Sequence, residues 1–488
     1  KPTPAPPATP KPTPAPPTPS PTPVLPTPQW APCPSDFTGI YSSCANVTVP
    51  AHWNGPASDG VVSFFLGRVQ PSSGTPPNTT IWFLGSGCVT PLTVWVPTMT
   101  SKNFEVVAVH VRGSAFAYPV LSCPASSMDS TTGWPLVSCA TDLTVSKTST
   151  FSLYEMARDI AYVIPLLGTT RNIVVGDGFG TLLAQRMQLI GPASVAAYVL
   201  SGFTAPDRYD VLSSTLDAFS TVARRVLDRC MTSSTCVTRL GGQDAWNLLL
   251  RLFQQAEDGS LACAASLQAK WQTPNLARSL SNMVAMLVSS SQNPMFAPTS
   301  TPTQAFLPAF LYRLERCLTE DVAALTTLYA ALNESAALTI PAGSCSVNSV
   351  LTFNIILAEL LQSTPHPGTV ANLLRDHTVQ PQALFFETLE ALAQVWPTYD
   401  VAPSQREYGT SRTPTALIAG SDDPFYPIEL AMYAAGMSYT LPNDMFQTLV
   451  GGTHDALQTT GASCIAAAIL LLAESPTASV PLCASVAA

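Results

Sequence analysis

The five residues Gly176-Asp177-Gly178-Phe179-Gly180 form a glycine-rich turn between two segments of different character. Before the turn, the apolar run 172–175 predicts a short buried strand, and after it the segment 181–187 predicts a helix. Small residues at 176 and 180 allow a strand and a helix to pass very close, and the central residue of such a turn has a strained backbone. The pattern predicts a sharp strand–turn–helix unit of an α/β fold.

The spacing matches a catalytic turn, Gly-x-nucleophile-x-Gly, whose central residue carries the attacking side chain. Here the central residue is Gly178, which has no side chain. A register centred on Asp177 is rejected, because Val175 and Phe179 would then fill the two small positions. From the pentapeptide alone, an ordinary glycine-rich turn of another α/β fold remains the alternative.

Two further residues follow in the chain order nucleophile, acid, histidine. Asp423 comes after the predicted strand 414–420, in a Gly-x-x-Asp-Pro turn. His454 comes after the predicted strand 446–450, at a glycine-rich tip from which a histidine would reach the turn. We therefore interpret Gly178, Asp423 and His454 as the positions of a relic triad, with no active catalytic residue, and expect the last two to lie within hydrogen-bonding reach and to point at Gly178.

Four short motifs give these residues a family context. They are Ser43–Pro50 (SCANVTVP), Val111-Arg112-Gly113-Ser114, Leu121-Ser122-Cys123-Pro124 and Leu311–Cys317 (LYRLERC). In this order the chain resembles the secreted prolyl- and tripeptidyl-aminopeptidase branch of the α/β-hydrolases, nearest to forms of oomycetes and related protists, from about Cys33 to Cys483. The resemblance implies an α/β-hydrolase sheet with an inserted helical cap.

The departures from that family concentrate on the catalytic side. The family's serine is Gly178, its Gly-Gly-Pro-Gly oxyanion loop is Gly85-Ser86-Gly87-Cys88, and its Asp-His-Arg-Gly segment is 110–113, His-Val-Arg-Gly. Loss of the serine alone removes covalent catalysis, which lowers turnover on the order of a million-fold. We therefore predict a pseudoenzyme that is not catalytically active.

The chain divides into four predicted parts: a proline-rich tail over 1–32, the first part of the core over 33–204, a helical cap over 205–401 and the second part of the core over 402–488. In the tail, Lys-Pro-Thr-Pro-Ala-Pro-Pro occurs twice, and such a composition favours an extended polyproline II conformation of about 3.1 Å per residue. The tail is either a passive stalk or a binding segment. We favour self-association through it, head to tail.

Composition excludes several classes of function. A net charge of −9 without a basic cluster argues against a nucleic-acid partner. The longest apolar run, 465–473, is too short for a membrane span. No cysteine pair has the spacing of a metal site, and the apolar stripes of the cap indicate packing, so we expect no metal and no cofactor.

The 12 cysteines favour disulfides and an oxidising compartment. Expected pairs are Cys33–Cys44, Cys123–Cys139, Cys230–Cys236 and Cys464–Cys483. Glycosylation sequons occur at Asn46, Asn78 and Asn333, and glycans would support the solubility of a chain with only 11% charged residues. We expect a secreted protein, extracellular or at the cell surface, whose export signal preceded Lys1.

Two classes of function remain. In the first, the chain is a secreted, glycosylated pseudohydrolase with a structural or adhesive role, such as a filament subunit. In the second, it is a serine-type aminopeptidase or esterase that works by another route or carries an engineered loss of its nucleophile. A receptor that binds a ligand in the old pocket is a third possibility.

Overall fold

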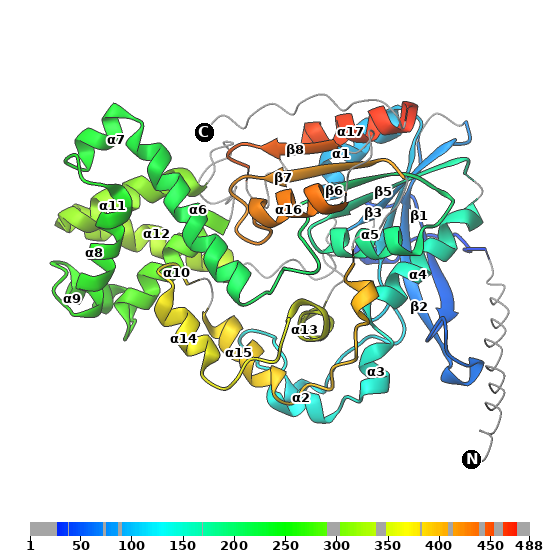
Figure 1. Ribbon diagram of the computed structural model, residues 1–488, viewed down its shortest axis with the longest axis horizontal. Coiled ribbons are helices and arrows are strands. Elements are labelled where there is room, and N and C mark those ends of the chain that lie inside the picture. Colours follow the sequence, from blue (N-terminus) through cyan, green and yellow to red (C-terminus); the bar gives the residue numbers. More distant parts are fainter. Residues whose placement is uncertain are drawn as a thin grey trace, which may run out of the picture.

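Eight strands form one sheet in the order β1-β2-β4-β3-β5-β6-β7-β8 in the computed structural model (Figure 1). The structure describes residues 27–37, 39–71, 75–85, 90–167, 169–289, 303–337, 348–380, 383–407, 413–438, 445–452 and 462–475. The strands are β1 (Ser43–Pro50), β2 (Val61–Val69), β3 (Thr79–Leu84), β4 (Glu105–His110), β5 (Arg171–Asp177), β6 (Val195–Ser201), β7 (Thr415–Gly420) and β8 (Met445–Leu449). The strands predicted from the apolar runs 172–175, 414–420 and 446–450 correspond to β5, β7 and β8.

The direction of the strands follows from their connections. β1 and β2 form an antiparallel hairpin, and β2 also pairs antiparallel with β4. From β4 to β8 every neighbouring pair is parallel. Parallel strands need long crossovers, which place helices on the faces of the sheet. β3 and β4 are accordingly buried along their whole length.

Helices cover both faces of this sheet. The helices around the sheet are α1 (Thr90–Ser101), α2 (Val137–Thr141), α3 (Val145–Ser149), α4 (Leu153–Val163), α5 (Phe179–Ile190), α16 (Ile428–Ser438) and α17 (Ala462–Glu474). Apolar residues of α4, α5 and α16 pack on one face, and those of α1 and α17 pack on the other. Successive residues of one strand enter opposite clusters, as Trp82 and Phe83 show.

An inserted segment of 213 residues, 202–414, separates β6 from β7, and most of its described part is helical. Its helices are α6 (Ser213–Met231), α7 (Ser234–Arg239), α8 (Ala245–Glu257), α9 (Ala264–Trp271), α10 (Leu276–Ser289), α11 (Leu307–Arg316), α12 (Thr319–Ala337), α13 (Ser349–Ile355), α14 (Thr369–Asp376) and α15 (Ala383–Ala393). The short turns of the chain are η1 (Ser35–Phe37), η2 (Ala57–Asp59), η3 (Ala125–Ser127), η4 (Ile164–Leu167), η5 (Thr303–Phe306), the π-helical η6 (Ile356–Leu360) and η7 (Pro403–Gln405).

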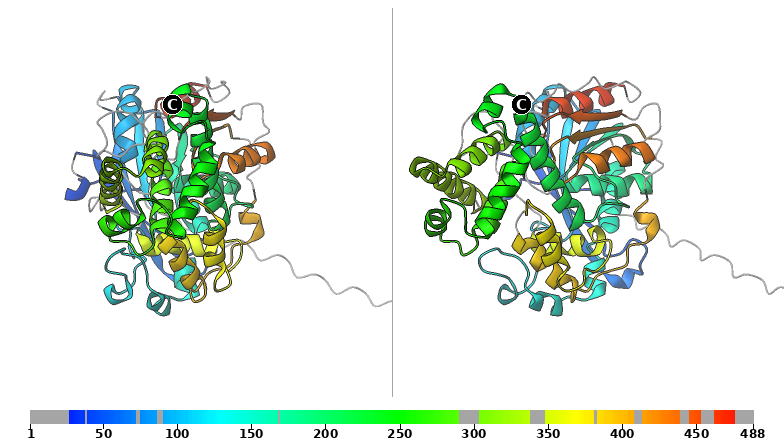
Figure 2. Two further views of the ribbon diagram at one scale, coloured as in Figure 1. Left: turned by 90° about the vertical axis from the view of Figure 1, so that its left-hand side faces the viewer. Right: turned by 60° about the vertical axis from the view of Figure 1, so that its left-hand side comes forward.

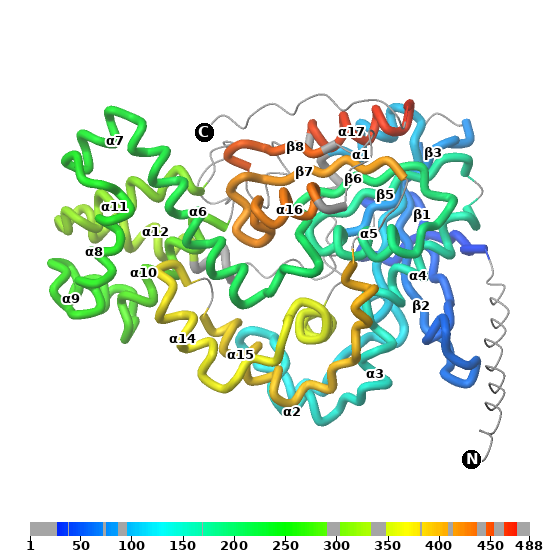
Figure 3. Tube along the Cα trace, in the orientation of Figure 1, coloured from blue at the N-terminus to red at the C-terminus, as the bar shows by residue number. Residues whose placement is uncertain are grey.

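The insertion has two parts that pack differently. The stretch from α6 to α12 has an apolar core of its own, built around residues such as Leu249 and Phe310, and stands to one side of the sheet (Figures 1 and 2). By contrast, η6, α14 and α15 contribute to the core that lies under the sheet. The trace in Figure 3 shows α13 and α15 below the sheet, close to α2 and α3 in the view. From here on, the cap means only the segment from α6 to α12, which is shorter than the helical cap predicted over 205–401.

Three of the disulfides in the described residues join cysteines that are close in the sequence, and a fourth joins two that are 54 residues apart. The predicted pairs Cys33–Cys44, Cys123–Cys139 and Cys230–Cys236 are confirmed. Cys263–Cys317, which joins the start of α9 to the end of α11, was not predicted from the sequence. The predicted partner of Cys464, Cys483, lies outside the described residues.

The chain reaches the sheet from its proline-rich end along the β1 edge. Ala31 forms an antiparallel bridge with Cys44 in β1, and the guanidinium of Arg68 lies 4.0 Å from the centre of the Trp30 ring. Residues 1–26 of the predicted tail lie outside the described residues. The tail, when extended, therefore starts from the edge of the sheet that is farthest in strand order from β7 and β8.

Candidate functional site

The turn between β5 and α5 has the backbone of a catalytic turn. Gly178 stands immediately before α5 with φ 52° and ψ −114°, a combination that strains any residue with a side chain. Its N–H donates to the Ser201 carbonyl at the end of β6, at 3.0 Å. Its carbonyl accepts a hydrogen bond of 2.6 Å from the Thr181 hydroxyl. The turn is thus fixed from both sides.

The two flanking glycines are required by space. A Cβ atom at Gly176 would lie 2.8 Å from the Gly180 carbonyl oxygen. A Cβ atom at Gly180 would lie 1.7 Å from the carbonyl oxygen of Leu84, at the end of β3. These contacts centre the close approach on Gly178. Asp177, the alternative centre, lies half-buried and accepts a hydrogen bond of 2.8 Å from the Ser201 hydroxyl.

Asp423 lies in the tight loop that follows β7. Its side chain is 1% exposed, and its Oδ1 accepts the backbone N–H groups of Phe425 and Tyr426 at 2.8 and 3.0 Å. The loop is closed on its other side by the N–H of Asp422, which donates to the Gly452 carbonyl at 2.8 Å. Asp423 is therefore held by its own turn, at the same carboxyl edge of the sheet as Gly178.

Two tyrosines, Tyr209 after β6 and Tyr426 after β7, bring the segments that follow these strands together. Burial raises the pKa of Tyr209 to about 12, although a hydrogen bond from Thr215 lowers it, and the charge of Asp423 raises it further. Burial also raises the pKa of Tyr426, and Tyr209, Asp423 and Asp177 raise it further. The two rings stack with centres 6.0 Å apart. Asp177 and Asp423 thus both act on one phenol, which keeps its proton.

The remaining triad and oxyanion positions lie outside the described residues. These are His454 and the segment 86–88 of the loop after β3. Gly85 at the start of that loop packs against the ring of Phe83, which a Cβ atom would approach to 2.8 Å. The described residues therefore provide the strained turn and the acid, and the triad itself stays a prediction.

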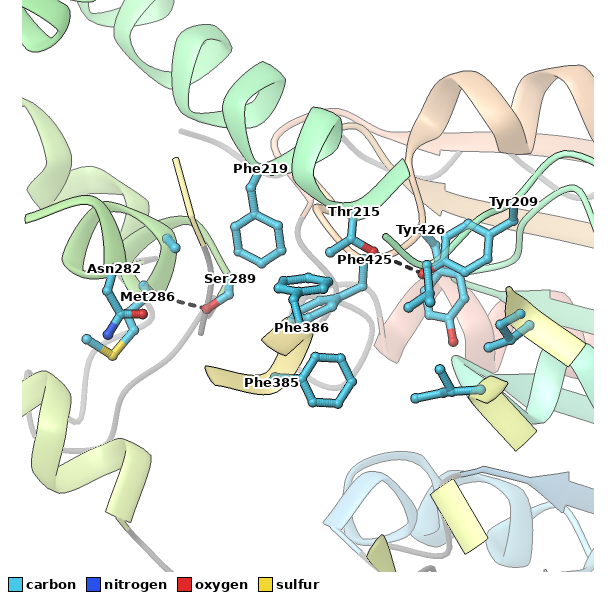
Figure 4. A pocket seen from close by; sticks show the side chains of 14 residues that line it. Tyr209, Thr215, Phe219, Asn282, Met286, Ser289, Phe385, Phe386, Phe425 and Tyr426 are labelled. Carbon is cyan, nitrogen blue, oxygen red and sulfur yellow. Dashed lines mark hydrogen bonds between the residues drawn. The ribbon is translucent and has the colours of Figure 1, made fainter. Parts of the chain in front are cut away.

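An aromatic cavity of about 380 Å³ opens between the sheet and the cap (Figure 4). Six rings line it together with aliphatic and small polar side chains, and none of the lining residues carries a formal charge: Tyr209, Val211, Thr215, Phe219, Asn282, Ala285, Met286, Ser289, Ile356, Leu360, Phe385, Phe386, Phe425 and Tyr426. Phe425 and Tyr426 directly follow the Asp423 turn. The cavity therefore adjoins the Asp423 turn of the candidate site.

Arg112, one of the residues that carry the family resemblance, has a structural role. Its guanidinium is fully buried and pairs with both carboxylate oxygens of Asp159 at 2.5 and 2.7 Å. The other N–H groups donate to the carbonyls of Pro50, Ala51 and Thr150. All five donors are used, so Arg112 fastens the loop after β4 to β1 and α4.

His110 and the arginines of LYRLERC are also parts of the framework. His110 lies among four aromatic rings, burial lowers its pKa to about 3, and its Nε2 is 2.9 Å from the Tyr41 hydroxyl. Arg313 and Arg316 at the end of α11 both bind the buried Asp321. These residues hold elements together and do not line the cavity.

The geometry of the turn and the order of the strands together define the architecture. The fold is that of the α/β-hydrolases. No family model and no curated protein matches the chain. Similar solved structures are a laboratory-evolved variant of potato epoxide hydrolase (13% identity, 85% of this chain, 96% of that chain, TM-score 0.37), an esterase from Exiguobacterium antarcticum (10%, 85%, 96%, 0.37) and a bromoperoxidase from Bacillus anthracis (10%, 88%, 100%, 0.37). At these values the likenesses carry no information on activity, and none concerns the aminopeptidase branch.

The other predicted sites are surface features. The side chains of Asn46 in β1 and Asn78 before β3 are exposed, as glycosylation requires, whereas that of Asn333 in α12 lies outside the description. Within the described ranges no group of three metal-binding side chains occurs. The described helices include none that is long and apolar enough to span a membrane.

Sequence reasoning missed the pair Arg229–Asp422, which joins the cap to the candidate site. Asp422 is fully buried, and both its oxygens accept from the Arg229 guanidinium on α6. One turn earlier, Arg225 donates to the Ser421 carbonyl at 2.7 Å and pairs with Glu429. The available signal was the i, i+4 spacing of two arginines within the predicted helical cap, but nothing in the local sequence indicates what they bind.

Proposed function

We propose that this chain is a catalytically inactive, secreted hydrolase-fold protein with a structural role outside the cell. The observation that carries the proposal is Gly178: the backbone of the turn is strained and tightly packed, yet the central position has no nucleophilic atom. Because the covalent route needs that atom, no acyl-enzyme forms on this turn. The disulfides of the described residues suit an oxidising compartment.

A structural role is supported by the tail as well as by the turn. Two copies of Lys-Pro-Thr-Pro-Ala-Pro-Pro precede the folded part, and a polyproline II segment loses little conformational entropy on docking. We infer that the tail of one copy binds the next copy, so that repeated head-to-tail contacts build an open filament. Glycans on Asn46, Asn78 and Asn333 would coat its surface.

The proposal of inactivity is tested with reagents that report on an active serine. We expect no labelling by a fluorophosphonate probe and no cleavage of aminoacyl or peptidyl amide reporters. A known serine hydrolase treated in parallel controls for the probe. Stoichiometric labelling, or turnover that survives repurification, would instead favour the second candidate function, an esterase or aminopeptidase that uses a nucleophile outside the turn.

The assembly proposal is tested by deleting residues 1–26. We expect the shortened chain to remain folded and monomeric in sedimentation, whereas the full chain assembles. Fibres of unchanged repeat from the shortened chain would show that the tail is only a stalk.

A further inference from the structure

The proposed function assigns no ligand to the aromatic cavity. We therefore ask which ligand its shape and chemistry would bind. Its walls come from six parts of the chain: the segments after β6 and β7, the cap helices α6 and α10, the π-helical turn η6 and helix α15. Six of the fourteen lining residues are buried, namely Tyr209, Val211, Thr215, Phe219, Ala285 and Phe386, whereas Phe425 is 37% exposed and the other seven are half-buried. The cavity thus has an apolar interior and an accessible rim.

The chemistry of the lining selects an uncharged, acceptor-rich ligand. Phe219, Phe385 and Phe386 present flat apolar surfaces, as Figure 4 shows. The polar lining groups are hydroxyls and an amide, and within the wall the Ser289 hydroxyl donates to the Met286 carbonyl while the Tyr209 and Thr215 hydroxyls bond to each other. Burial raises the pKa of Tyr209 and Tyr426, so both phenols stay protonated and uncharged over the physiological pH range. Aromatic surfaces with interspersed donors are the usual recognition site for proline-rich chains, whose carbonyls accept hydrogen bonds and whose prolines have no N–H.

The chain itself carries a proline-rich, acceptor-rich segment in residues 1–26, which is uncharged between its two lysines, Lys1 and Lys11, and after Lys11. This segment contains two lysines and no acidic residue, whereas the whole chain has a net charge of −9, so the segment and the folded part attract each other. In a polyproline II conformation 26 residues would reach about 80 Å. The length is ample to enter another molecule.

Geometry favours a neighbouring molecule over the same one. The segment leaves the β1 edge of the sheet, whereas the cavity lies beyond the ends of β6 and β7. At about 4.8 Å per strand, five to six strand spacings separate them by about 24–29 Å along the sheet. A polyproline II chain is stiff over several residues and does not readily turn back around its own domain.

We propose that the aromatic cavity of one copy binds the proline-rich segment 1–26 of a neighbouring copy. This inference rests on the proposed function, since it names the acceptor of the self-association assigned to the tail. The cavity that a hydrolase fold would use for substrate then serves as a socket for assembly.

The main test uses the full chain and a photo-crosslinker. Ala8, between the two repeats, is replaced by a photoreactive phenylalanine, and isotopically heavy and light copies are mixed before irradiation. We expect crosslinks between heavy and light copies that map to the cavity walls on α10, α15 or the loop after β7. Crosslinks only within one copy, or only to other surfaces, would overturn the proposal.

Cavity variants give an independent readout of assembly. Phe425→Ala removes an exposed part of the wall, and Met286→Trp fills the space from a half-buried position on α10. We expect each to raise the concentration needed for assembly at least tenfold, and a synthetic peptide of residues 1–17 to inhibit assembly of the unaltered chain. Leu384→Ala and Met432→Ala, exposed residues that do not line the cavity, are the matched controls and should assemble normally. Circular dichroism establishes that each variant is folded.

The outcomes separate this inference from the function on which it rests. If deletion of residues 1–26 abolishes assembly but folded cavity variants assemble normally, the tail binds elsewhere and only the socket is wrong. If the deletion leaves assembly unchanged, the assembly function itself fails. If a small apolar molecule copurifies in the cavity and the peptide does not displace it, the cavity is a ligand site and the proposal is overturned.

Discussion

At the scale of single residues, the turn around Gly178 requires glycine for two different reasons at two different positions. Position 178 needs an unusual backbone conformation, with φ 52° and ψ −114°, whereas position 180 needs the absence of a Cβ atom. Gly191, at the end of α5, provides a third case: its φ is 66°, but a Cβ atom there would have no neighbouring atom within 4 Å. Strain and collision therefore occur separately in one short segment.

Alanine substitutions at these glycines should rank by mechanism. We expect Gly191→Ala to cost about 1–2 kcal/mol of unfolding free energy, from the left-handed backbone alone. Gly178→Ala should cost about 1–3 kcal/mol from backbone strain. Gly180→Ala should cost more than either or prevent folding, because its Cβ atom would overlap the Leu84 carbonyl. Urea denaturation measures all three, and equal losses at positions 180 and 191 would contradict the packing argument.

His110 should make the protein sensitive to acid. Its folded-state pKa is about 3, below its ordinary value of 6.5, because burial disfavours the charged ring. Between those two values the unfolded chain binds a proton that the folded chain does not, so stability falls as pH falls from about 6.5 to 3. His110→Gln, which retains a group able to hydrogen-bond the Tyr41 hydroxyl, should remove this part of the pH dependence. Urea midpoints from pH 4.5 to 7.5 test it; parallel profiles would exclude His110 as the cause.

The residue-level predictions from sequence succeeded where the reason was local. Glycine spacing located the close approach of β5 and α5, and short separations gave three disulfides correctly. Cys263–Cys317 and Arg229–Asp422 were not predicted, because their partners are 54 and 193 residues apart. Only the folded arrangement brings such groups together.

At the scale of elements, helix α6 fastens the cap to the loop of the candidate acid. Arg225 and Arg229 lie one turn apart and both bind the segment Ser421–Asp422. The buried Asp422 has its charge compensated mainly from the cap side. A movement of the cap away from the sheet would have to break this contact, so the cap is held at its attachment next to the cavity.

Loss of Arg229 should be costly. Arg229→Met leaves the fully buried Asp422 without its cation, and for buried pairs this costs about 3–5 kcal/mol. Because the Arg229 side chain is 38% exposed, we expect a value at or below the lower end. Arg224→Met on the same helix removes only an exposed pair with Asp228 and should cost less than about 1 kcal/mol. Equal urea midpoints for the two variants would show that the clamp contributes nothing.

The two cap disulfides should differ in their effect on stability. Loop-closure entropy gives about 4 kcal/mol for Cys263–Cys317, which encloses 54 residues, and about 2 kcal/mol for Cys230–Cys236, which encloses 6. Paired Cys→Ser variants of each, compared by urea denaturation, should show the larger loss for the longer loop. The reverse order would mean that these disulfides do not stabilise the protein mainly by lowering the conformational entropy of the unfolded chain.

At the scale of the whole molecule, the helices of the insertion contribute to two separate hydrophobic cores. The stretch from α6 to α12 has its own apolar cluster, whereas η6, α14 and α15 share the core under the sheet. From sequence the entire stretch 205–401 is one run of helical patterns, because amphipathic periodicity identifies a buried face without naming what it packs against. The cavity lies where these bodies meet, which explains why no single motif predicted it.

This division predicts that the cap opens separately from the sheet. Leu249 is fully buried at the centre of the cap cluster, so Leu249→Ala should lower the opening free energy of cap amides by about 2–5 kcal/mol. Native-state hydrogen exchange resolves such units, because each cooperative segment exchanges with its own free energy. Amides of α8 and α11 should become less protected, while those of β3 and β5 keep their protection. Leu183→Ala, at a buried position on α5 under the sheet, is the matched control and should lower the protection of β3 and β5. If Leu249→Ala instead lowers protection equally in cap and sheet, the molecule unfolds as one unit, and the contacts around Asp422 join the two cores into a single cooperative structure.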